Sequence, residues 1–515
     1  MNYGLIYRTV KHLKLTQVVH QVKNRLVKAK YVPLSAPAVK GSGFKTEPIP
    51  RYKSLEGNRF TFLNLEHEYA GWGFNEFGNL WTYNQNYFDW INQEDASTSS
   101  ATEGCKWIDR FIEDEIAGQA RNEGSMAMDP YPIALRSINW IKFFCKYPET
   151  AKKDRLDSLY SQVRLLERKL EYHLLANHLL EDAYGLYIGA TYFGDERLMK
   201  KASRLLIEQL EEQILPDGAH YEQSPMYHCI MLDRLLDCIN ISCHTADKCH
   251  TDRTDHTDRL SAYAERMLGH LESIVWKDGS IPLLNDAAYG IAPMPAEIFD
   301  YARRLGLTWL AIPMKECGYR KMASDRMEAI VDVGNITATY QPGHTHADSL
   351  NYELRIDGKP FVVDTGISTY NKNERRQQER STIAHNCVSP DGRNSSEVWG
   401  GFRVGRRCHT DLTDLTDEIA GQARNEVVAS HNGFGKACKR RFEMTNEGFV
   451  VEDWYDGEAV SYVHLAENAD SDRIKVEGAI SIETKPWKYS TEYNRFHDGK
   501  VVEISFEGHV IYQIS

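Results

Sequence analysis

The spacing of apolar residues changes near residue 315, and this change constrains the fold more than any other feature of the sequence. Before that point apolar residues recur every three or four positions, a spacing that predicts helices, as at Leu156, Leu159, Val163, Leu166 and Leu170. The clearest helical segments are residues 154–180, 196–215 and 226–242. Because helix follows helix with short turns, we expect paired helices stacked as a solenoid or closed into a toroid.

After Cys317 the apolar segments become short and rich in Val, Ile, Tyr and Phe, which predicts strands. They are residues 328–334, 336–340, 351–356, 360–366, 448–455 and 501–515. Turn formers such as Asp357-Gly358 and Asp498-Gly499 separate them. Many short strands favour antiparallel sheets packed as a sandwich, so the sequence predicts a helical half followed by a β half.

Composition and charge narrow the class of protein. The chain has 515 residues, 42% of them hydrophobic and 26% charged, which fits two or three globular domains with sizeable cores. Its net charge of −12 argues against a nucleic-acid binder, which would carry a basic footprint. A local basic cleft could still attract an acidic glycan. The ten cysteines show no paired CxxC spacing, and free thiols explain them more simply than a disulfide framework.

The N-terminal segment is basic and has apolar residues at roughly helical spacing (residues 1–34). It lacks the continuous apolar core and small-residue cleavage site of a signal peptide, and no stretch of about 18 apolar residues occurs anywhere in the chain. These features predict a cytoplasmic protein, with a periplasmic location as the alternative. The segment is read either as a membrane-surface or partner-binding helix, or, as we favour, as a helix packed on the body of the protein.

Two short sequences occur twice. DEIAGQARNE stands at residues 114–123 and 417–426, and CHTD at residues 249–252 and 408–411. Identical decapeptides in a helical and a β half cannot share a packing role, so we interpret them as inserted repetitive sequence at surface loops. The His-rich residues 244–256 could alternatively bind metal, although their low complexity argues against it.

Two helical motifs carry polar groups suited to chemistry. NHLLED, residues 177–182, offers an amide and an imidazole side by side at the end of a long helical run, although helix-end capping would explain it equally. In PDGAHYEQSPMYH, residues 216–228, Ser224 before Pro225 predicts a helix N-cap. Tyr227 and His228 then fall in the first turn, where the helix dipole favours anions and could lower the pKa of the Tyr227 phenol. A pair of partly buried aromatic residues is the alternative.

Two motifs of the β half carry imidazoles and a carboxylate. In GHTHADSLNYELRIDGKPFVVDTG, residues 343–366, His344 and His346 would share one face of an extended segment. Asp364 ends an apolar run, and a buried carboxylate there needs a strong partner. With His385 of RSTIAHNCV, His346 and Asp364 make a plausible zinc ligand set. A buried His–Asp contact without metal would explain these residues as well.

These stretches together resemble the heparinase II/III family. The strongest match is residues 343–366 followed by STIAHNCVSPDGRNSSEVWGGFRVG, which looks like the C-terminal β domain of that family. DPYPIALRSINWIKFF (residues 129–144), NHLLED and DGAHYEQSPMYH look like its alginate-lyase-like helical toroid. The resemblance implies an incomplete (α/α) toroid followed by an antiparallel β-sandwich. The expected boundaries are a basic helical extension over 1–55, the toroid over 56–315 and the sandwich over 316–515.

The resemblance also implies β-elimination on an acidic, uronic-acid-containing polysaccharide. This reaction needs a neutralised carboxylate, a base for the C5 proton and an acid for the departing oxygen. By resemblance, Asn177 would neutralise the carboxylate with help from His178, Tyr227 would be the base, the acid or both, and His344 would be its partner. A neighbouring positive charge would then have to lower the pKa of Tyr227 from about 10.

Further roles follow from the same resemblance. His346, Asp364 and His385 look like ligands of a structural zinc ion that would fix the orientation of His344. Arg136, Asn139 and Arg380 would contact sugar or carboxylate groups.

Other functions stay open. No signal peptide is visible, and the resemblance to capsule or exopolysaccharide cluster proteins is at least as good. Both observations argue against the assumption that heparin itself is the substrate. The alternatives are a non-catalytic glycan-binding or assembly protein on the same scaffold, and a zinc hydrolase with an open coordination position.

Overall fold

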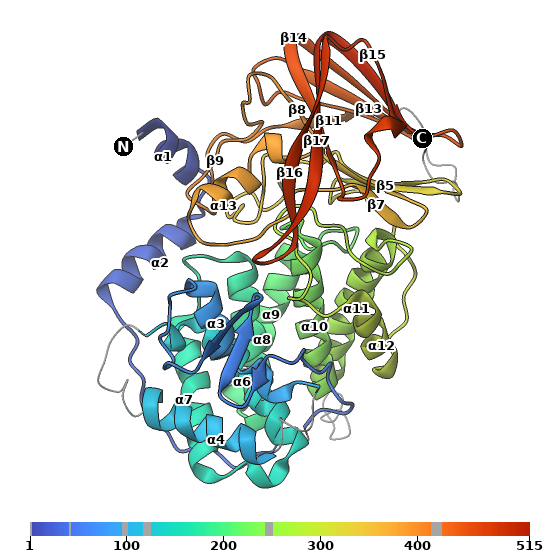
Figure 1. Ribbon diagram of the computed structural model, residues 1–515. Helices are drawn as coiled ribbons and strands as arrows, with labels where there is room; N and C mark the ends of the chain where they lie inside the picture. Colours follow the sequence, from blue (N-terminus) through green and yellow to red (C-terminus); the bar gives the residue numbers. More distant parts are fainter. Residues whose placement is uncertain (1–2, 41–42, 95–100, 117–124, 243–250, 414–424) are drawn as a thin grey trace.

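The computed structural model describes residues 3–40, 43–94, 101–116, 125–242, 251–413 and 425–515. A helical half and a β half lie end to end, as the change of periodicity predicts (Figure 1). The repeated DEIAGQARNE segments and the His-rich stretch fall largely outside the described residues. Among the helices in these ranges, none combines the length and the apolar character that crossing a membrane requires.

The helical half is built from long neighbouring helices. α6 packs against α7 and α8, α8 against α9 and α10, and α10 against α11 and α12. One apolar cluster runs through these contacts and buries Leu159, Val163 and Leu166 of the predicted stripe completely. The elements are α3 (Asn79–Tyr87), α4 (Ala101–Phe111), α6 (Pro130–Lys146), α7 (Lys153–Lys169), α8 (Ala176–Phe193), α9 (Glu196–Gln213), α10 (Pro225–Ser242), α11 (Thr251–Ile274) and α12 (Pro295–Arg304).

Two features of this half differ from the prediction. The segment 154–180 is interrupted: α7 ends at Lys169 and α8 begins at Ala176, so NHLLED starts a helix and does not end one. The chain turns between them through Leu175 and Ala176, two non-glycine residues with positive φ. Because such a backbone is rare for Leu and Ala, their identity does not predict the turn. A small antiparallel sheet of β1 (Leu55–Glu56), β2 (Arg59–Phe62) and β3 (Leu65–Glu68) also precedes the helices.

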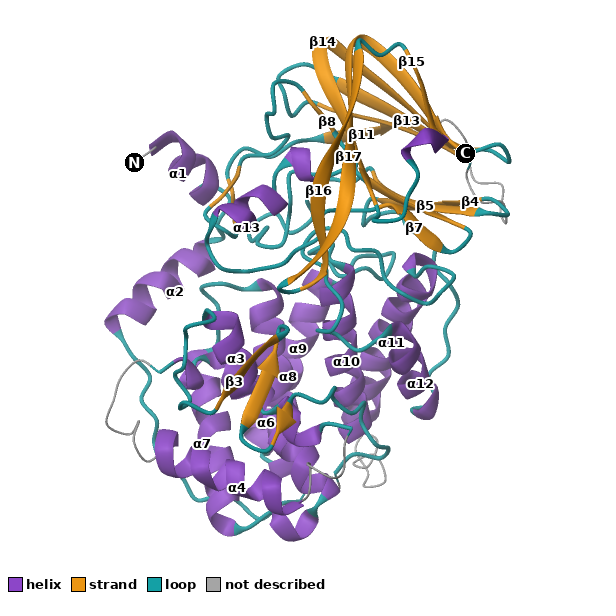
Figure 2. Ribbon diagram, viewed as in Figure 1, coloured by secondary structure: helices purple, strands orange, loops and turns teal. Residues whose placement is uncertain are grey.

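The β half consists mainly of one curled antiparallel sheet (Figure 2). Its strands are β4 (Tyr319–Ala323), β5 (Met327–Asp332), β6 (Tyr352–Ile356), β7 (Lys359–Val362), β8 (Val388–Ser389), β11 (Thr410–Thr413), β12 (Glu426–His431), β13 (Cys438–Met444), β14 (Phe449–Leu465), β15 (Ile474–Glu477), β16 (Ser481–Glu492) and β17 (Arg495–Ile514). One apolar cluster joins side chains such as Leu354 of β6, Phe442 of β13 and Ile504 of β17, so the curled sheet encloses its own core. The predicted antiparallel strands are confirmed. The predicted sandwich of two layers is not, because hydrogen bonds join these strands into one sheet.

Local predictions in the β half have mixed outcomes. The Asp357-Gly358 turn joins β6 to β7, and both residues have positive φ as a tight hairpin requires. Asp498-Gly499 is not a turn, because both residues pair within the β16–β17 ladder. Residues 336–340, predicted as a strand, form turn and loop in place of a ladder.

The β16–β17 hairpin reaches from the β half to the helical half (Figure 1). Its turn lies at Tyr493 and Asn494, where Asn494 has positive φ. At this tip Asn64 donates hydrogen bonds to the Tyr493 carbonyl (2.9 Å) and the Glu492 carboxylate (3.1 Å). Asn494 in turn donates to the Leu63 carbonyl at 2.8 Å. The hairpin therefore ties the two halves together.

The basic N-terminal extension forms α1 (Tyr3–Val10) and α2 (Leu15–Leu26), which run along one side of the molecule (Figure 1). Both helices contact the body, as we favoured, but they do so through polar groups. Most of their large apolar side chains remain exposed, whereas Leu5 and Ile6 of α1 are half-buried.

Candidate active site

A cavity of about 590 Å³ is lined by residues from both halves. Four residues proposed for catalysis on the basis of family resemblance, Asn177, His178, Tyr227 and His344, all line it. The helical half supplies the first three, and His344 comes from the loop between β5 and β6. Aromatic side chains make up much of the remaining wall, namely Tyr83, Tyr87, Tyr131, Tyr370 and Phe402.

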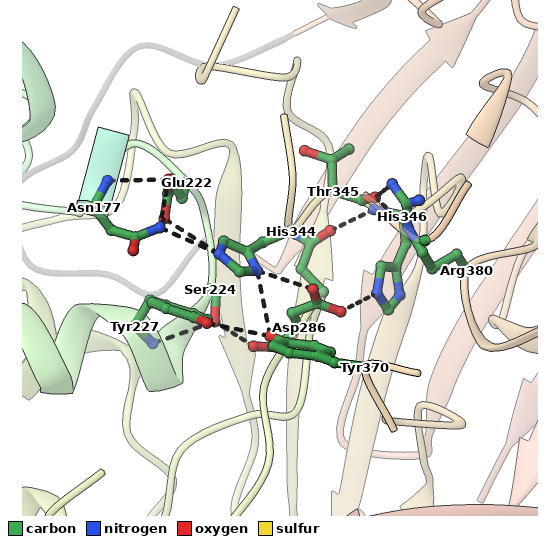
Figure 3. A network of polar contacts seen from close by, with 12 residues as sticks. Asn177, Glu222, Ser224, Tyr227, Asp286, His344, Thr345, His346, Tyr370 and Arg380 are labelled. Atoms are coloured by element: carbon green, nitrogen blue, oxygen red, sulfur yellow. Dashed lines mark hydrogen bonds and ion pairs between the residues drawn. The ribbon is translucent and has the colours of Figure 1, made fainter. Parts of the chain in front are cut away.

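Asn177 stands at the start of α8, directly after the positive-φ residues Leu175 and Ala176. Its side-chain amide donates to both carboxylate oxygens of Glu222, at 3.0 and 2.9 Å (Figure 3). The same Nδ2 lies 3.3 Å from Nε2 of His344. Asn177 thus links the two walls of the cavity, and a side-chain amide is a suitable donor for a substrate carboxylate.

Glu222 is a site residue that the sequence argument missed. It lies within the DGAHYEQSPMYH motif, is almost fully buried and lines the cavity. Its carboxylate is 3.8 Å from His344 Nε2. Nothing in its sequence context separates it from an exposed glutamate, so only the fold reveals it.

Tyr227 lies in the first turn of α10, as the Ser224-Pro225 signal predicts. The Ser224 hydroxyl accepts a hydrogen bond from the Tyr227 backbone amide at 3.3 Å, which is the expected cap. Burial, together with the negative charges of Asp286 and Glu222, raises the pKa of Tyr227 above its usual value. The expected lowering is therefore wrong for this structure, because burial outweighs the hydrogen bond from Tyr370 and the charge of Arg376, which both lower the pKa of Tyr227.

His344 is held by a buried carboxylate. Its Nδ1 lies 2.9 Å from Oδ2 of Asp286, and the ring centroids of His344 and Tyr227 are 3.9 Å apart (Figure 3). Because an ionised Asp286 can only accept, Nδ1 of His344 carries the hydrogen and donates a hydrogen bond to Asp286. The other nitrogen, Nε2, then presents its lone pair to the side of the ring occupied by Asn177.

Asp286 organises this wall. Its two oxygens also accept from both terminal nitrogens of Arg376, at 2.5 and 2.7 Å, and pair with Nε2 of His346 at 2.8 Å. Burial alone would raise the pKa of Asp286, but the charge of Arg376 and the bonds from His344 and His346 hold it well below its usual range. His344 and His346 thus meet one carboxylate from a loop, which agrees with the expectation that they share a face.

Asp286 and Tyr370 were also missed in the sequence. Asp286 follows the apolar run IPLLN, so the rule that singled out Asp364 could have found it. The Tyr370 hydroxyl lies 3.4 Å from the Tyr227 hydroxyl and 3.3 Å from His344 Nδ1. Tyr370 therefore touches both residues of the proposed acid–base pair.

His178 faces the same cavity from α8. Its Nδ1 is 3.0 Å from the Glu171 carboxylate. Burial would lower the pKa of His178, but the charge and hydrogen bond of Glu171 outweigh it and raise the pKa. His178 can therefore bring a positive charge to the cavity wall.

The three predicted sugar-binding residues lie elsewhere. Arg136 is fully buried and donates to Gln162 and to the carbonyls of Asn86 and Ala127. Arg380 is fully buried and donates to the Thr345 carbonyl at 2.8 Å. Both guanidinium groups are thus engaged inside the protein, which corrects the expectation that they contact substrate.

Asn139 is also buried. It donates to the Tyr87 carbonyl at 2.9 Å and lines a smaller neighbouring cavity that shares Tyr87 and Tyr227 with the main one. Asn139 is therefore outside the cavity that holds Asn177 and His344.

The predicted zinc ligands lie behind His344. Asp364 accepts from His385 Nδ1 at 2.7 Å, which supplies the strong partner that its burial requires. His346 and His385 have ring centroids 5.2 Å apart. Nδ1 of His346 and Nε2 of His385 are buried and have no hydrogen-bond partner in the described structure. Two imidazole nitrogens are thus free to bind a metal, while both oxygens of Asp364 are already hydrogen-bonded.

Two other groups bear on metal binding. Oδ2 of Asp348 is buried without a hydrogen-bond partner in the described structure, and burial raises the pKa of this residue to about 6. Within the described ranges, the group of three potential ligands with atoms all within 4.8 Å of one another is Asp217, His270 and Cys317. The eight cysteines that the structure describes are free thiols, as expected.

Comparison with known proteins finds two family models and one curated relative that match this chain. Residues 134–302 match the family model described as the heparinase II/III N-terminus, and residues 308–508 match the heparinase II/III-like C-terminal model. A heparin-sulfate lyase of Pedobacter heparinus is 21% identical over 355 residues, which are 63% of this chain and 50% of that protein. The chain thus spans about half the length of this curated relative.

Solved structures share the fold. Heparinase III superposes with a TM-score of 0.63 at 14% identity, covering 100% of this chain and 86% of that one. A heparan sulfate lyase from Pedobacter heparinus gives a TM-score of 0.55 at 14% identity, over 97% of this chain and 88% of the other. At such identities the likeness concerns the fold alone.

Proposed function

Because this chain belongs to the heparinase II/III family, we propose that it is a polysaccharide lyase that cleaves a uronic-acid-containing polysaccharide by β-elimination. The observation that carries the proposal is the meeting of Asn177, Tyr227 and His344, from three distant parts of the chain, in one cavity. They supply an amide, a phenol and an imidazole, which match the three requirements of the reaction.

The helical wall would neutralise the substrate carboxylate. The Asn177 amide donates to it, and His178, which Glu171 helps to keep protonated, adds positive charge. Withdrawing charge from the carboxylate acidifies the neighbouring C5–H bond. When Asn177 turns to the substrate, it gives up its contact with His344 and frees Nε2.

His344 would then be the base. Its Nδ1–H remains bonded to Asp286, so Nε2 accepts the C5 proton and Asp286 stabilises the imidazolium that forms. The electron pair of the broken C5–H bond forms the C4–C5 double bond, and the C4–O glycosidic bond breaks.

Tyr227 would be the acid. Its raised pKa keeps the phenol protonated at neutral pH, so it can donate the proton to the departing oxygen. The phenolate is then reprotonated from His344, whose ring lies 3.9 Å from that of Tyr227. Of the roles that the sequence left open for Tyr227, the structure thus favours the acid.

A structural zinc ion remains part of the proposal. Its support is that His346 and His385 each offer a buried nitrogen, and Asp348 a buried oxygen, with no hydrogen-bond partner in the described structure. These atoms are not among the described groups of three ligand atoms that lie within 4.8 Å of one another. The ion would anchor the wall behind His344 and take no part in proton transfer. Elemental analysis of the purified protein should find zinc, and H346A/H385A should lose it together with thermal stability. Equal metal content in both proteins would remove this site.

The test of the lyase proposal is the Tyr227→Phe variant. A panel of uronate polysaccharides is incubated with the native protein, and unsaturated sugar ends are followed by their ultraviolet absorbance. Native protein should produce them, and Tyr227→Phe should lower the rate by at least about a thousandfold, since a proton donor is lost from the transition state. An unchanged rate in this variant would remove the mechanism.

A non-catalytic glycan-binding protein is the second candidate. It is favoured by the aromatic wall of the cavity and by Glu222, which occupies the Asn177 amide. It predicts saturable saccharide binding without unsaturated ends across the whole panel.

A further inference from the structure

The N-terminal helices expose an apolar face that the rest of the protein does not cover. In α2, one helix face carries Leu15, Val18, Val19, Val22 and Leu26, at positions i, i+3, i+4, i+7 and i+11, and each is between 44% and 79% exposed. We call these five residues the apolar stripe. In α1, Tyr3, Tyr7 and Val10 are exposed in the same way. Gln17 is the buried residue of α2, and α1 has none.

Such exposure is concentrated here. Eleven of the sixteen strongly exposed large apolar side chains found in the described ranges lie between Tyr3 and Val39. Single exposed apolar residues are ordinary on a protein surface, whereas a continuous patch marks a contact site.

The helices are fixed in this orientation by polar contacts. Arg8 donates to both oxygens of Glu397, at 2.8 and 2.6 Å. Gln17 donates to the Leu174 carbonyl at 3.1 Å, and Asn24 lies 3.2 Å from the ring of His173. The polar side of the helices therefore meets the body, and the apolar stripe faces outward.

The charge of this segment is opposite to that of the whole chain. Residues 1–46 contain nine Lys and Arg and no Asp or Glu, although the chain carries a net charge of −12. Lys23, Arg25 and Lys28 lie on or next to α2 and are exposed. An apolar stripe bordered by basic residues is the pattern of a helix that lies in a membrane interface.

Charge also separates the possible occupants. Two copies of α2 meeting along the apolar stripe would bring their lysines and arginines together, with no acid in residues 1–46 to offset them. An anionic lipid surface offers apolar depth and negative charge together. We propose that α1 and α2 form a docking surface for an anionic membrane.

The docking surface adjoins the cavity. Gln17 donates to the carbonyl of Leu174, and Leu174 lines the cavity. Lys14 lies 4.0 Å from the centre of the Tyr340 ring, and the next residue, Gln341, also lines the cavity. Docking would therefore hold the cavity beside the lipid surface. This inference stands on the N-terminal helices alone and does not depend on the proposed reaction.

The test is co-sedimentation of the full chain with lipid vesicles. The protein should sediment with vesicles that contain phosphatidylglycerol and remain in the supernatant with pure phosphatidylcholine, and added salt should release it. V18D/V22D should lower the bound fraction about tenfold, because it places charge on the apolar stripe. K23E/K28E, which leaves the stripe intact, should also weaken binding.

The matched control is I480D/I482D, which changes two exposed apolar residues in and next to β16. It should bind as the native protein does, and circular dichroism should show that all variants are folded. No binding to anionic vesicles, or equal binding by V18D/V22D, would overturn the proposal. A dimer in solution that V18D/V22D dissociates would also overturn it, because the apolar stripe would then be the interface between two copies of the chain.

Discussion

The two walls of the cavity hold their polar groups in different ways. On the helical wall, Asn177 and Tyr227 stand in the first turns of α8 and α10, and backbone geometry fixes them: positive φ at Leu175 and Ala176 before one, a serine cap before the other. On the β wall, His344 lies in a loop and is oriented by Asp286, which also binds His346 and Arg376.

The two walls therefore differ in how they respond to the loss of a side chain. On the helical wall, loss of Asn177 removes a donor to Glu222 but leaves Tyr227 in place, because separate helix starts position the two side chains. The β wall depends on one buried carboxylate, and its loss would release an imidazole and leave a buried cation unpaired at once.

Asp286→Asn should have the largest effect. Removing one partner of a buried ion pair costs about 3–5 kcal/mol of unfolding free energy, and the released His344 should lower kcat by about a hundredfold or more. Denaturant unfolding and the rate of unsaturated-end formation measure the two effects.

Asp453→Asn is the matched control. Asp453 makes a similar buried pair with Arg440, at 2.6 and 2.8 Å, within the β sheet. It should cost comparable stability and leave kcat of the folded protein unchanged. If both variants lose activity equally, the claim that Asp286 acts on activity through His344 would be contradicted.

Asn177→Ala should have the next largest effect, and on activity more than on stability. Loss of one donor to a developing negative charge lowers kcat/KM by about a hundred- to a thousandfold, while Tyr227 stays in place. Asn240→Ala removes another buried asparagine, which bonds Thr46 and Tyr301 away from the cavity, and should spare kcat/KM. A large shift of Tyr227 in a crystal structure of Asn177→Ala would contradict the independence of the helical wall.

The smallest effect is expected from pH. Burial, with the charge of Arg440, lowers the pKa of His431 in β12 to about 4. An unfolded histidine titrates near 6.5, so below that pH the unfolded state binds a proton that the folded state does not. His431 should therefore contribute about 2 kcal/mol to the fall of the unfolding free energy between pH 7 and 5. Other buried histidines with lowered pKa values, such as His220 and His270, add their own contributions, so His431→Gln should make the fall smaller by about 2 kcal/mol. If the variant shows the same dependence of unfolding free energy on pH as the native protein, groups other than His431 cause that dependence.

Sequence reasoning predicted what depends on neighbours along the chain. The Ser224-Pro225 cap placed Tyr227 correctly, and apolar spacing found α9 and α10. The start of α8 was missed because left-handed Leu and Ala have no sequence signature. The turn expected at Asp498-Gly499 failed because pairing over the long β16–β17 hairpin outweighs a local turn preference.

The candidate site was only partly predictable. Asn177, Tyr227 and His344 came from family resemblance, and no spacing in the chain would have joined them. Asp286 and Glu222 act through contacts between distant segments. Arg136 was assigned to sugar binding by family resemblance, yet a glutamine and two carbonyls satisfy it inside the helical half.

The β16–β17 hairpin has a consequence for how a polymer would be received. Its tip is bonded to Leu63 and Asn64 of the opposite half, so it acts as a cross-brace between the walls. Walls braced in this way keep their spacing before any sugar arrives. The proposed base and acid are then already positioned around one sugar ring when the protein has folded. Much of the entropic cost of positioning them therefore falls on folding and does not recur in each turnover.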